Sequence, residues 1–330
     1  MVKTFSFSHF LPVECYIPPD TVVCRVPPEN VVFSPHGQTL LACYRWEGIF
    51  SWDVAQLDQP PRVFRPFGDE KFDREMYLSV TVSAEGKQFV TSSDEKTFRL
   101  WEVGIDTPIS EFPLQGGEAN AAAFSSTANL VAYQDAEDQI YIWDVATGEL
   151  RDSYKGDNDG EHYFPLAFCQ NGTILASQLC YIYDVIQGKK VDGFSSDNFQ
   201  FQAFSHDNNH IWVDKYPKVD TIELWHIQRY EKILSILKPN PILSNEEEND
   251  LGSFVVSDCG QYLACGLCTW PTSLEKARVH VYDIRNRRTP IVSFDIPETS
   301  VCPLAFLPDN MLLASISTES IYLWDLKPYL

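Results

Sequence analysis

The sequence predicts an all-β protein folded as a seven-bladed β-propeller, with four antiparallel strands in each blade. Three observations predict this fold. A short apolar segment that ends in an aromatic residue recurs seven times along the chain. Each copy follows two further strand-like segments joined by a turn. Most copies are separated by about the 40–45 residues that a four-stranded propeller blade requires. Repetition of this kind lets one all-β architecture extend over the full 330 residues.

The recurring segment is expected to be the third strand of each blade. It lies near residues 49–54, 98–103, 140–145, 181–185, 222–227, 279–284 and 321–326. Its aromatic residues are Trp52, Trp101, Trp143, Tyr183, Trp225, Tyr282 and Trp324. An acidic residue follows most of these aromatic residues, so the seven segments can be aligned on the aromatic–acid pair.

The first and second strands of each blade are expected in the segment before the aromatic strand. Examples are VVFSPHGQTLLACY in the first blade and PLAFLPDNMLLASI in the last. Ser, Pro, Asn, Asp and Gly cluster between the two apolar halves, and these residues favour hairpin turns. The apolar halves are nearly continuous, as expected for strands that neighbouring blades cover on both faces. A looser fourth strand follows each aromatic strand, as in residues 62–67 and 290–294.

The repeated units resemble WD40 repeats, and the resemblance covers essentially the whole chain. It rests on the aromatic–acid pairs Trp52–Asp53, Trp143–Asp144 and Trp324–Asp325, which follow the same kind of hairpin. The sequence departs from the family pattern because the Gly–His pair expected before each innermost strand is missing. We therefore expect the His–Ser–Trp hydrogen-bond network of the family to be absent from most blades. Apolar packing must then supply the rigidity of the blades.

An N-terminal strand is expected to close the ring. The last aromatic strand ends at Leu326, so the C-terminal part of the chain does not supply an outer strand for blade seven. Open sheet edges promote aggregation, and a propeller avoids this by pairing the edge with the other end of the chain.

Residues 21–26 are assigned to this closing strand, because residues 21–33 align with residues 292–306. Under this assignment residues 1–19 form an N-terminal arm and residues 20–330 form the propeller. The alternative is that residues 3–7 close the ring and the chain up to residue 29 is a long loop.

The composition limits the classes of partner and compartment. The chain has a formal net charge of -21 and nine cysteines. An acidic surface repels phosphate backbones and anionic lipids, so neither nucleic acid nor a membrane is an expected partner. We find no apolar run of about 18 residues and no secretion signal. The cysteines lie mostly in apolar strands, as reduced thiols do. We expect a protein of the cytoplasm, or of the nucleus in a eukaryotic cell.

The resemblance to WD40 repeats implies a binding surface on the narrower, top face of the disc. That face carries the turns between second and third strands and the loops from each fourth strand to the next blade. The longest loops belong to it and lie at residues 65–77, 155–164, 238–251 and 269–278. They are rich in Asp and Glu, so we expect this rim to bind a protein segment rich in Lys or Arg. The alternative is that these carboxylates are solvated loop tips.

Twelve residues at or beside the top face are candidates for partner binding. They are Arg45, Trp46, Tyr77, Glu95, Asp135, Tyr163, Phe199, Tyr216, Glu246, Glu247, Glu248 and Trp270. Trp46 and Trp270 each follow a second strand, and exposed tryptophans often dominate the energy of a protein interface.

Motifs for catalysis or metal binding are weak. Cys265 and Cys268 form a C-x-x-C pair, with Cys259 before and His280 after it. A structural zinc site needs four ligands, and side chains three residues apart on a strand point to opposite faces. The other histidines are scattered, and no G-x-S-x-G, P-loop or G-x-G-x-x-G occurs. We therefore expect neither a metal nor a cofactor.

The function expected from these observations is a non-catalytic scaffold that binds a protein or peptide segment and is monomeric on its own. Two alternatives use the central channel of the propeller. One is a propeller enzyme, either a hydrolase or a lyase, which would require titratable groups with shifted pKa values at the channel mouth. The other is a small-ligand sensor, which would require a deep apolar channel with convergent polar groups.

Overall fold

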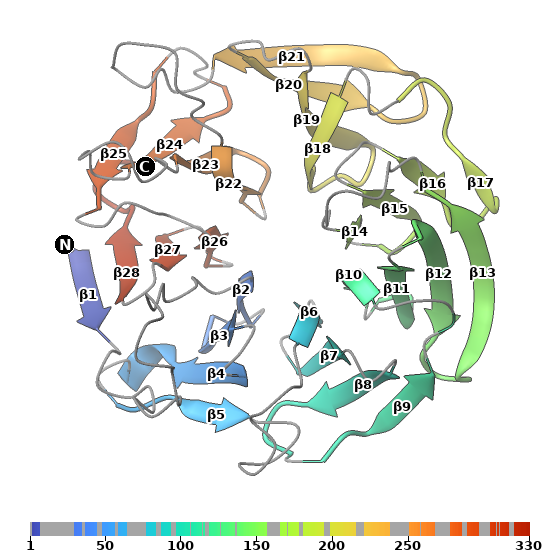
Figure 1. The fold of residues 1–330 in the computed structure, drawn as a ribbon. Helices are drawn as coiled ribbons and strands as arrows, with labels where there is room; N and C mark the ends of the chain where they lie inside the picture. Colours follow the sequence, from blue (N-terminus) through green and yellow to red (C-terminus); the bar gives the residue numbers. More distant parts are fainter. Residues whose placement is uncertain are drawn as a thin grey trace, which may run out of the picture.

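The described strands form seven sheets, and each sheet has four antiparallel strands (Figure 1). The computed structural model describes residues 2–6, 30–34, 37–44, 48–56, 59–64, 77–83, 87–93, 97–105, 107–113, 115, 119–125, 127–135, 137–156, 166–169, 171–177, 181–194, 199–215, 221–237, 251–257, 259–267, 278–285, 289–296, 304–307, 309, 311–316 and 320–330. The sheets are arranged in a circle and are numbered here as blades one to seven in chain order. The predicted seven-bladed β-propeller is therefore confirmed.

The first four blades run from the inner strand to the outer strand in chain order. Blade one contains β2 (Asn30–Phe33), β3 (Thr39–Tyr44), β4 (Gly48–Asp53) and β5 (Arg62–Phe64), with the short 3-10 helix η1 (Val54–Gln56). Blade two contains β6 (Tyr77–Val82), β7 (Gln88–Ser93), β8 (Thr97–Glu102) and β9 (Ser110–Pro113). Blade three contains β10 (Ala119–Ser125), β11 (Leu130–Asp135), β12 (Gln139–Asp144) and β13 (Glu149–Lys155). Blade four contains β14 (Leu166–Phe168), β15 (Ile174–Ser177), β16 (Ile182–Asp184) and β17 (Lys189–Lys190).

The remaining blades repeat this order until the last strand. Blade five contains β18 (Phe199–Phe204), β19 (His210–Lys215), β20 (Thr221–His226) and β21 (Glu231–Leu237). Blade six contains β22 (Leu251–Val256), β23 (Tyr262–Leu267), β24 (Arg278–Asp283) and β25 (Val292–Asp295). Blade seven contains β26 (Leu304–Phe306), β27 (Leu312–Ile316), β28 (Ser320–Asp325) and β1 (Val2–Ser6). No helix in these described segments is long and apolar enough to cross a lipid bilayer.

The seven predicted aromatic strands are the third strands β4, β8, β12, β16, β20, β24 and β28, each close to its expected bounds. Their aromatic side chains are buried in six blades, and Trp225 in blade five is partly buried. The second strand β11 is buried at all six positions, which fits the continuous apolar runs of the sequence. The outer strand β13 is mostly exposed and carries charged residues, which discourage other strands from pairing with its free edge.

Blade seven takes its outer strand from the extreme N-terminal part of the chain. Strand β1 pairs antiparallel with β28, with Val2 opposite Trp324 and Ser6 opposite Ser320. Figure 1 shows β1 beside β28. The assignment of residues 21–26 to this position is therefore wrong, and the alternative at residues 3–7 lies within one residue of the observed strand.

The expected boundary after an arm of residues 1–19 does not fit this pairing either, because residues 2–6 are part of blade seven. Residues 21–26 themselves lie outside the described residues. The alignment compared the segment before blade one with the segment that joins blade six to blade seven. The connection from an outer strand to the next inner strand varies in length from blade to blade. A match between two such segments therefore does not show where the outer strand lies.

The described core residues form seven apolar clusters, and each cluster joins two neighbouring blades. Leu41 and Ile49 of blade one pack with Phe89 and Trp101 of blade two. The other clusters join blades two and three, three and four, four and five, five and six, and six and seven. A last cluster packs Trp52 of blade one with residues of blade seven, so the circle of sheets closes through apolar contacts.

Hydrogen bonds from buried tryptophans supplement this packing. The Trp101 indole donates to Thr91 Oγ1 at 3.0 Å, and the Trp324 indole donates to Ser315 Oγ at 3.0 Å. Part of the network that we expected to be absent from most blades is therefore present in blades two and seven. In blade five the Trp225 indole donates instead to the carboxylate of buried Glu223 at 2.9 Å.

We predict that Thr91→Val lowers the free energy of unfolding by about 1–3 kcal/mol, because the buried Trp101 N–H loses its acceptor. Thr91→Ser retains a hydroxyl and should cost clearly less. Urea unfolding followed by tryptophan fluorescence measures both. Equal stability of the Val and Ser variants would show that this hydrogen bond contributes little.

Deletion of residues 1–6 should destabilise the protein, because it leaves the outer edge of β28 without its five-residue partner strand. At about 0.5–1.5 kcal/mol for each lost hydrogen bond, the Tm should fall by on the order of 5 °C or more. Thermal unfolding followed by circular dichroism measures the change. Thr4→Val, which keeps the backbone ladder, is the control. A truncated chain with the same Tm as the intact chain would contradict the stabilising role of β1.

Candidate functional site

The two faces of the disc differ in which connections they carry. In an antiparallel sheet with neighbouring strands in chain order, alternate turns fall at the same end. The bottom face therefore carries the turns from first to second strands and from third to fourth strands. The top face carries the turns from second to third strands and the loops to the next blade. The bottom turns are largely described, whereas the four long top loops lie mainly outside the described residues.

Most of the candidate residues predicted for the top face also lie outside the described residues. These are Arg45, Trp46, Glu95, Tyr163, Tyr216, Glu246, Glu247, Glu248 and Trp270. Tyr77 is the first residue of β6, and only its backbone is described. The assignment of these residues to a binding surface therefore stays a prediction.

The structure places two other candidates, Asp135 and Phe199, inside the protein, with 3% of each residue exposed. Asp135 organises the turn after β11, where its Oδ1 accepts hydrogen bonds from the backbone N–H of Glu137 at 3.0 Å and of Gln139 at 2.8 Å. Phe199 packs edge-on against Trp225, with ring centroids 5.1 Å apart. Their expected place on an exposed rim needs correction, since a turn network and the core occupy these side chains.

The bottom face has a repeated turn built by the acidic residue that ends the third strand. Asp53, Asp144, Asp184, Asp283 and Asp325 each accept, through Oδ1, the backbone N–H two residues later. Such a side-chain cap replaces a backbone hydrogen bond in a tight turn. The acid of the aromatic–acid pair therefore has a structural role, which is to cap the turn after the third strand.

The first-to-second-strand turns of neighbouring blades approach each other closely on this face. At Gly172 a Cβ atom would lie 2.4 Å from the Cβ of Ala128 and 2.6 Å from Ser125 Oγ, and φ is +70°. Only glycine avoids both the contact and the strain. Between blades four and five, the Asn171 N–H donates to Asn208 Oδ1 at 3.3 Å.

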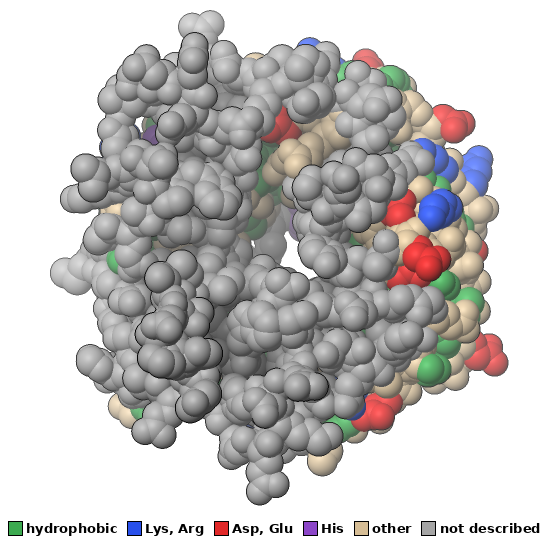
Figure 2. Space-filling model, in the orientation of Figure 1, with side chains coloured by type: hydrophobic (Ala, Val, Ile, Leu, Met, Phe, Trp, Pro, Cys, Tyr) green, Lys and Arg blue, Asp and Glu red, His purple; other side chains and the backbone are tan. Residues whose placement is uncertain are grey.

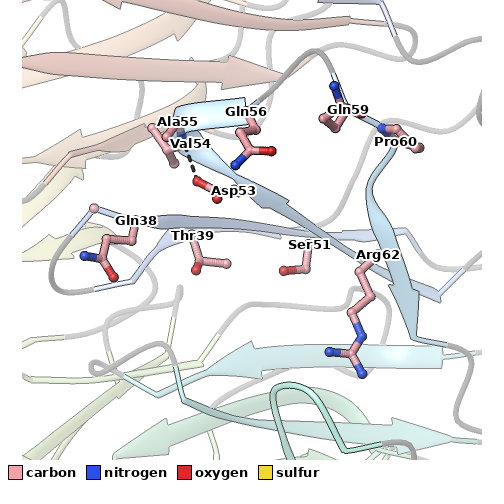
Figure 3. Close-up of a pocket in the computed structure, with 11 residues that line it drawn as sticks. Gln38, Thr39, Ser51, Asp53, Val54, Ala55, Gln56, Gln59, Pro60 and Arg62 are labelled. Carbon is pink, nitrogen blue, oxygen red and sulfur yellow. Dashed lines mark hydrogen bonds between the residues drawn. The ribbon is translucent and has the colours of Figure 1, made fainter.

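A groove of about 850 Å³ lies on the bottom of blade one (Figure 3). Its walls are residues 37–39, Ser51, residues 53–56 and the segment that ends at Arg62. In Figure 3, Arg62 extends away from the capped turn at Asp53, and its Nη2 donates to the Gly104 carbonyl of blade two at 2.9 Å. This arginine thus links two blades.

A smaller pocket of about 290 Å³ lies between blades four and five. Two turns of blade four, at residues 171–174 and 184–187, form one side of it. Residues 207–209 and 227–228 of blade five form the other side. The pocket is therefore a product of blade packing, since its two sides come from different repeats.

Hydrogen bonds fix the charge on the blade-five side of this pocket. Asp207 Oδ1 accepts from Ser205 Oγ at 2.5 Å and from the Asn209 N–H at 3.0 Å, and His210 Nδ1 lies 2.7 Å from Oδ2. Burial alone would raise the pKa of Asp207, but these hydrogen bonds outweigh it and hold the pKa below its usual range. Asp207 is therefore ionised at neutral pH.

Large apolar side chains are exposed near the third-to-fourth-strand turns of several blades. They include Ile105, Ile186 and Tyr230, and Tyr329 follows the last third strand. Figure 2 shows the described outer edge over β13 and β17, where acidic and basic side chains are interspersed. The described surface thus carries scattered exposed apolar side chains and a mixture of acidic and basic side chains.

Two of the sulfur and imidazole side chains of blade six, Cys265 and His280, are buried in the sheet, whereas Cys259 in the turn after β22 is exposed. Cys265 is buried, and burial raises the pKa of its thiol to about 12. Burial also lowers the pKa of His280 to about 4, with the charge of Arg278 acting in the same direction and Asp295 opposing it. His280 Nδ1 lies 2.8 Å from Ser293 Oγ. Cys268 lies outside the described residues, and within the described ones no three acidic, cysteine or histidine residues are placed to hold a metal ion.

Known proteins resemble this chain in sequence over part of its length and in fold over nearly all of it. No family model matches the sequence. The chain is 28% identical over 160 residues, 46% of its length, to apoptotic protease-activating factor 1 of Homo sapiens. It is 30% identical over 73 residues, 22% of its length, to the protein of the same name from Rattus norvegicus. The matched segments cover 12% and 6% of those proteins, so this chain corresponds to a small part of each.

A chain in a crystal structure of the mitotic checkpoint complex superposes on 93% of this chain with a TM-score of 0.69, and 96% of that chain is covered. The two sequences are 13% identical, so this likeness concerns the fold.

We predict that His280 makes stability depend on pH. Its pKa is about 4 in the folded protein and near 6.5 in the unfolded chain, so the unfolded chain binds more protons between these values. The free energy of unfolding should therefore fall by up to about 3 kcal/mol as the pH falls from about 6.5 to 4. Urea unfolding at pH 7, 5.5 and 4.5 should show a flatter dependence for His280→Gln. The same pH dependence of the free energy of unfolding in the intact protein and in His280→Gln would contradict this prediction.

Proposed function

We propose that this chain, a seven-bladed β-propeller, belongs to the WD40-repeat proteins and is a non-catalytic scaffold that binds segments of other proteins. The supporting observation is the way in which the blades are joined. Among the described residues, seven buried apolar clusters hold neighbouring blades together in a frame from which exposed turn residues project. Loops on a rigid frame carry function disproportionately.

The surface chemistry supports a macromolecular partner. Exposed Ile186 and Tyr230 offer apolar contacts beside polar turns, a combination typical of protein interfaces. The similar propeller in the mitotic checkpoint complex is itself a chain of an assembly. By analogy, the present chain would contribute a binding surface to a complex.

The top face is the proposed site for a basic partner segment. Its long loops carry Asp and Glu in a chain of net charge -21, and such a field attracts Lys and Arg and repels acidic competitors. Trp46 and Trp270 would supply the apolar anchors beside these carboxylates. The proposed site thus combines long-range attraction with a few aromatic contacts.

We further propose that the protein is a monomer of the cytoplasm or nucleus. The free thiols of Cys169, Cys259 and Cys265 are compatible with a reducing compartment. The strong negative charge opposes self-association. Size-exclusion chromatography with light scattering tests the monomer directly.

A Lys/Arg-rich peptide should bind the protein, and its affinity should fall as salt rises from 50 to 500 mM. Trp46→Ala and Trp270→Ala should each weaken binding about tenfold, because each removes an apolar anchor worth about 1.4 kcal/mol. Isothermal titration calorimetry measures the affinities.

Tyr329→Ala is the matched control, because Tyr329 is an exposed aromatic residue outside the proposed site and its removal should leave the affinity unchanged. A peptide with Gln at each basic position controls for charge. The top-face site is wrong if both tryptophan variants bind like the intact protein or if the Gln peptide binds equally well.

A further inference from the structure

The turns that follow the third strands differ in charge between two sectors of the bottom face. Each turn runs from the residue after the third strand to the second residue of the fourth strand, and in blade seven it is residues 326–330. In blades four to seven these turns hold eight Lys and Arg residues and one Glu, at residues 185–190, 227–232, 284–293 and 326–330. In blades one to three they hold one Arg and four Asp and Glu residues, at residues 54–63, 103–111 and 145–150.

This difference reverses the charge of the chain locally. The whole chain has 25 basic and 46 acidic residues. Blades four to seven are consecutive in the ring, so their basic turns belong to one sector of the disc (Figure 1). We call this sector the basic rim, and its exposed basic residues within the described part of the chain are Lys189, Arg229, Lys232, Arg285 and Lys327.

Acidic groups at the basic rim offset only part of its charge. Lys232 Nζ lies 3.1 Å from the carboxylate of buried Glu223. Arg285 pairs with Asp283 at 2.9 Å but leaves 70% of its side chain exposed. Three of the four turns also follow an acid that caps them through Oδ1, namely Asp184, Asp283 and Asp325. Basic residues remain in excess when these three acids are included.

Three cations of the basic rim are available to a partner. Within the described segments, no acidic group forms an ion pair with Lys189, Arg229 or Lys327. The carboxylate of Asp207, in a neighbouring bottom turn, is paired with His210 instead. A carboxylate of another molecule would therefore meet cations that do not have to leave an acidic partner first.

Large apolar side chains are exposed on the same turns. Ile186 in blade four is 67% exposed, Tyr230 in blade five is 40% exposed and Tyr329 in blade seven is 49% exposed. Each of them lies within three residues of an exposed Lys or Arg. Apolar contacts surrounded by charged groups are typical of a surface that binds protein.

Packing against the preceding blade holds these turns along the rim. A Cβ atom at Gly193, after the outer strand of blade four, would lie 2.7 Å from the ring of Tyr230 in blade five, and Gly193 has φ +103°. The Tyr329 ring of blade seven packs edge-on against Phe294 of blade six, with centroids 6.1 Å apart. The turns are therefore positioned before any partner binds, which lowers the entropic cost of binding.

We propose that the basic rim binds an acidic segment of a partner protein, whose carboxylates pair with Lys189, Arg229 and Lys327 and whose apolar residues pack on Ile186 and Tyr230. The proposal rests on the scaffold function proposed above. It gives the bottom face a partner of the opposite charge to that proposed for the top face.

Charge screening favours a protein segment over a nucleic acid at this rim. Charges more than about 8 Å apart are largely screened at physiological ionic strength. A short acidic segment therefore interacts mainly with the basic rim and little with the rest of this acidic chain. A nucleic acid carries phosphates along its whole length and extends past the rim to surfaces that repel it.

The test uses the full chain and two peptides, acetyl-Glu-Glu-Leu-Glu-Glu-Leu-Glu-Glu-amide and the same peptide with Gln in place of every Glu. Isothermal titration calorimetry at low salt should show binding of the Glu peptide. The Gln peptide should bind at least about tenfold more weakly, and the affinity of the Glu peptide should fall as salt rises.

Neutral variants of the basic rim should weaken the Glu peptide. Lys189→Gln and Arg229→Gln should each lower the affinity about threefold, and the double variant about tenfold, as expected for exposed ion pairs at separate turns. Lys87→Gln is the matched control, because Lys87 is an exposed lysine in a bottom turn of blade two, outside the basic rim. This variant should bind like the intact protein, and near-ultraviolet circular dichroism verifies that all variants are folded.

Ile186→Ser tests the apolar contact separately. It should weaken the Glu peptide several-fold and have no effect on a peptide with Gly in place of each Leu. Ile105→Ser is the matched control, because Ile105 is an exposed isoleucine in the corresponding turn of blade two. It should leave the affinity unchanged.

The proposal is overturned if the Gln peptide binds as well as the Glu peptide, or if the double variant binds the Glu peptide normally. It is also overturned if a single-stranded oligodeoxynucleotide of the same length binds more tightly than the Glu peptide. Self-association of the intact protein that the double variant abolishes would overturn it too, since a second copy would then occupy the rim. If only the Glu peptide fails and the Lys/Arg-rich peptide still binds at the top face, only the basic rim is rejected. Failure of both peptides would reject the scaffold function as well.

Discussion

Apolar packing between neighbouring sheets is the interaction on which the rest of this structure depends. A single four-stranded sheet cannot bury both of its faces, so each blade relies on the blades before and after it. Trp101 illustrates this, since it packs with Phe89 in its own blade and with Leu41 and Ile49 of the previous one. These contacts fix the strands from which the described turns project. The bottom pocket exists because they set the distance between blades four and five.

The acid after the third-strand aromatic shows how a repeated residue can have a structural role. In five blades its Oδ1 caps the following turn, and this structural role accounts for its recurrence. Asp184 differs in its surroundings, because a pocket from the adjacent blade faces it. The same turn cap thus has different surroundings where the neighbouring repeat supplies an opposite wall.

The sequence was sufficient to predict the blades, because each third strand carries its own local signal, such as Trp143–Asp144 after an apolar run. It was insufficient for β1, whose pairing with β28 joins segments at opposite ends of the chain and leaves no local mark. Asp135 and Phe199 were misplaced because strand-end position does not reveal burial. The pocket was missed for a related reason. Asn171 and Asn208 are ordinary turn residues in the sequence, and only blade packing brings them together.

The pairing of β1 with β28 also determines when blade seven can be completed during synthesis. Strand β1 is synthesised before the other strands of the seven blades, so it can pair in blade seven only after β28 has been made. Until then the nascent chain holds an unpaired strand and an open circle of sheets, with the apolar faces of its end blades uncovered. Such a chain would depend on chaperones during synthesis more than a protein whose early segments fold among themselves.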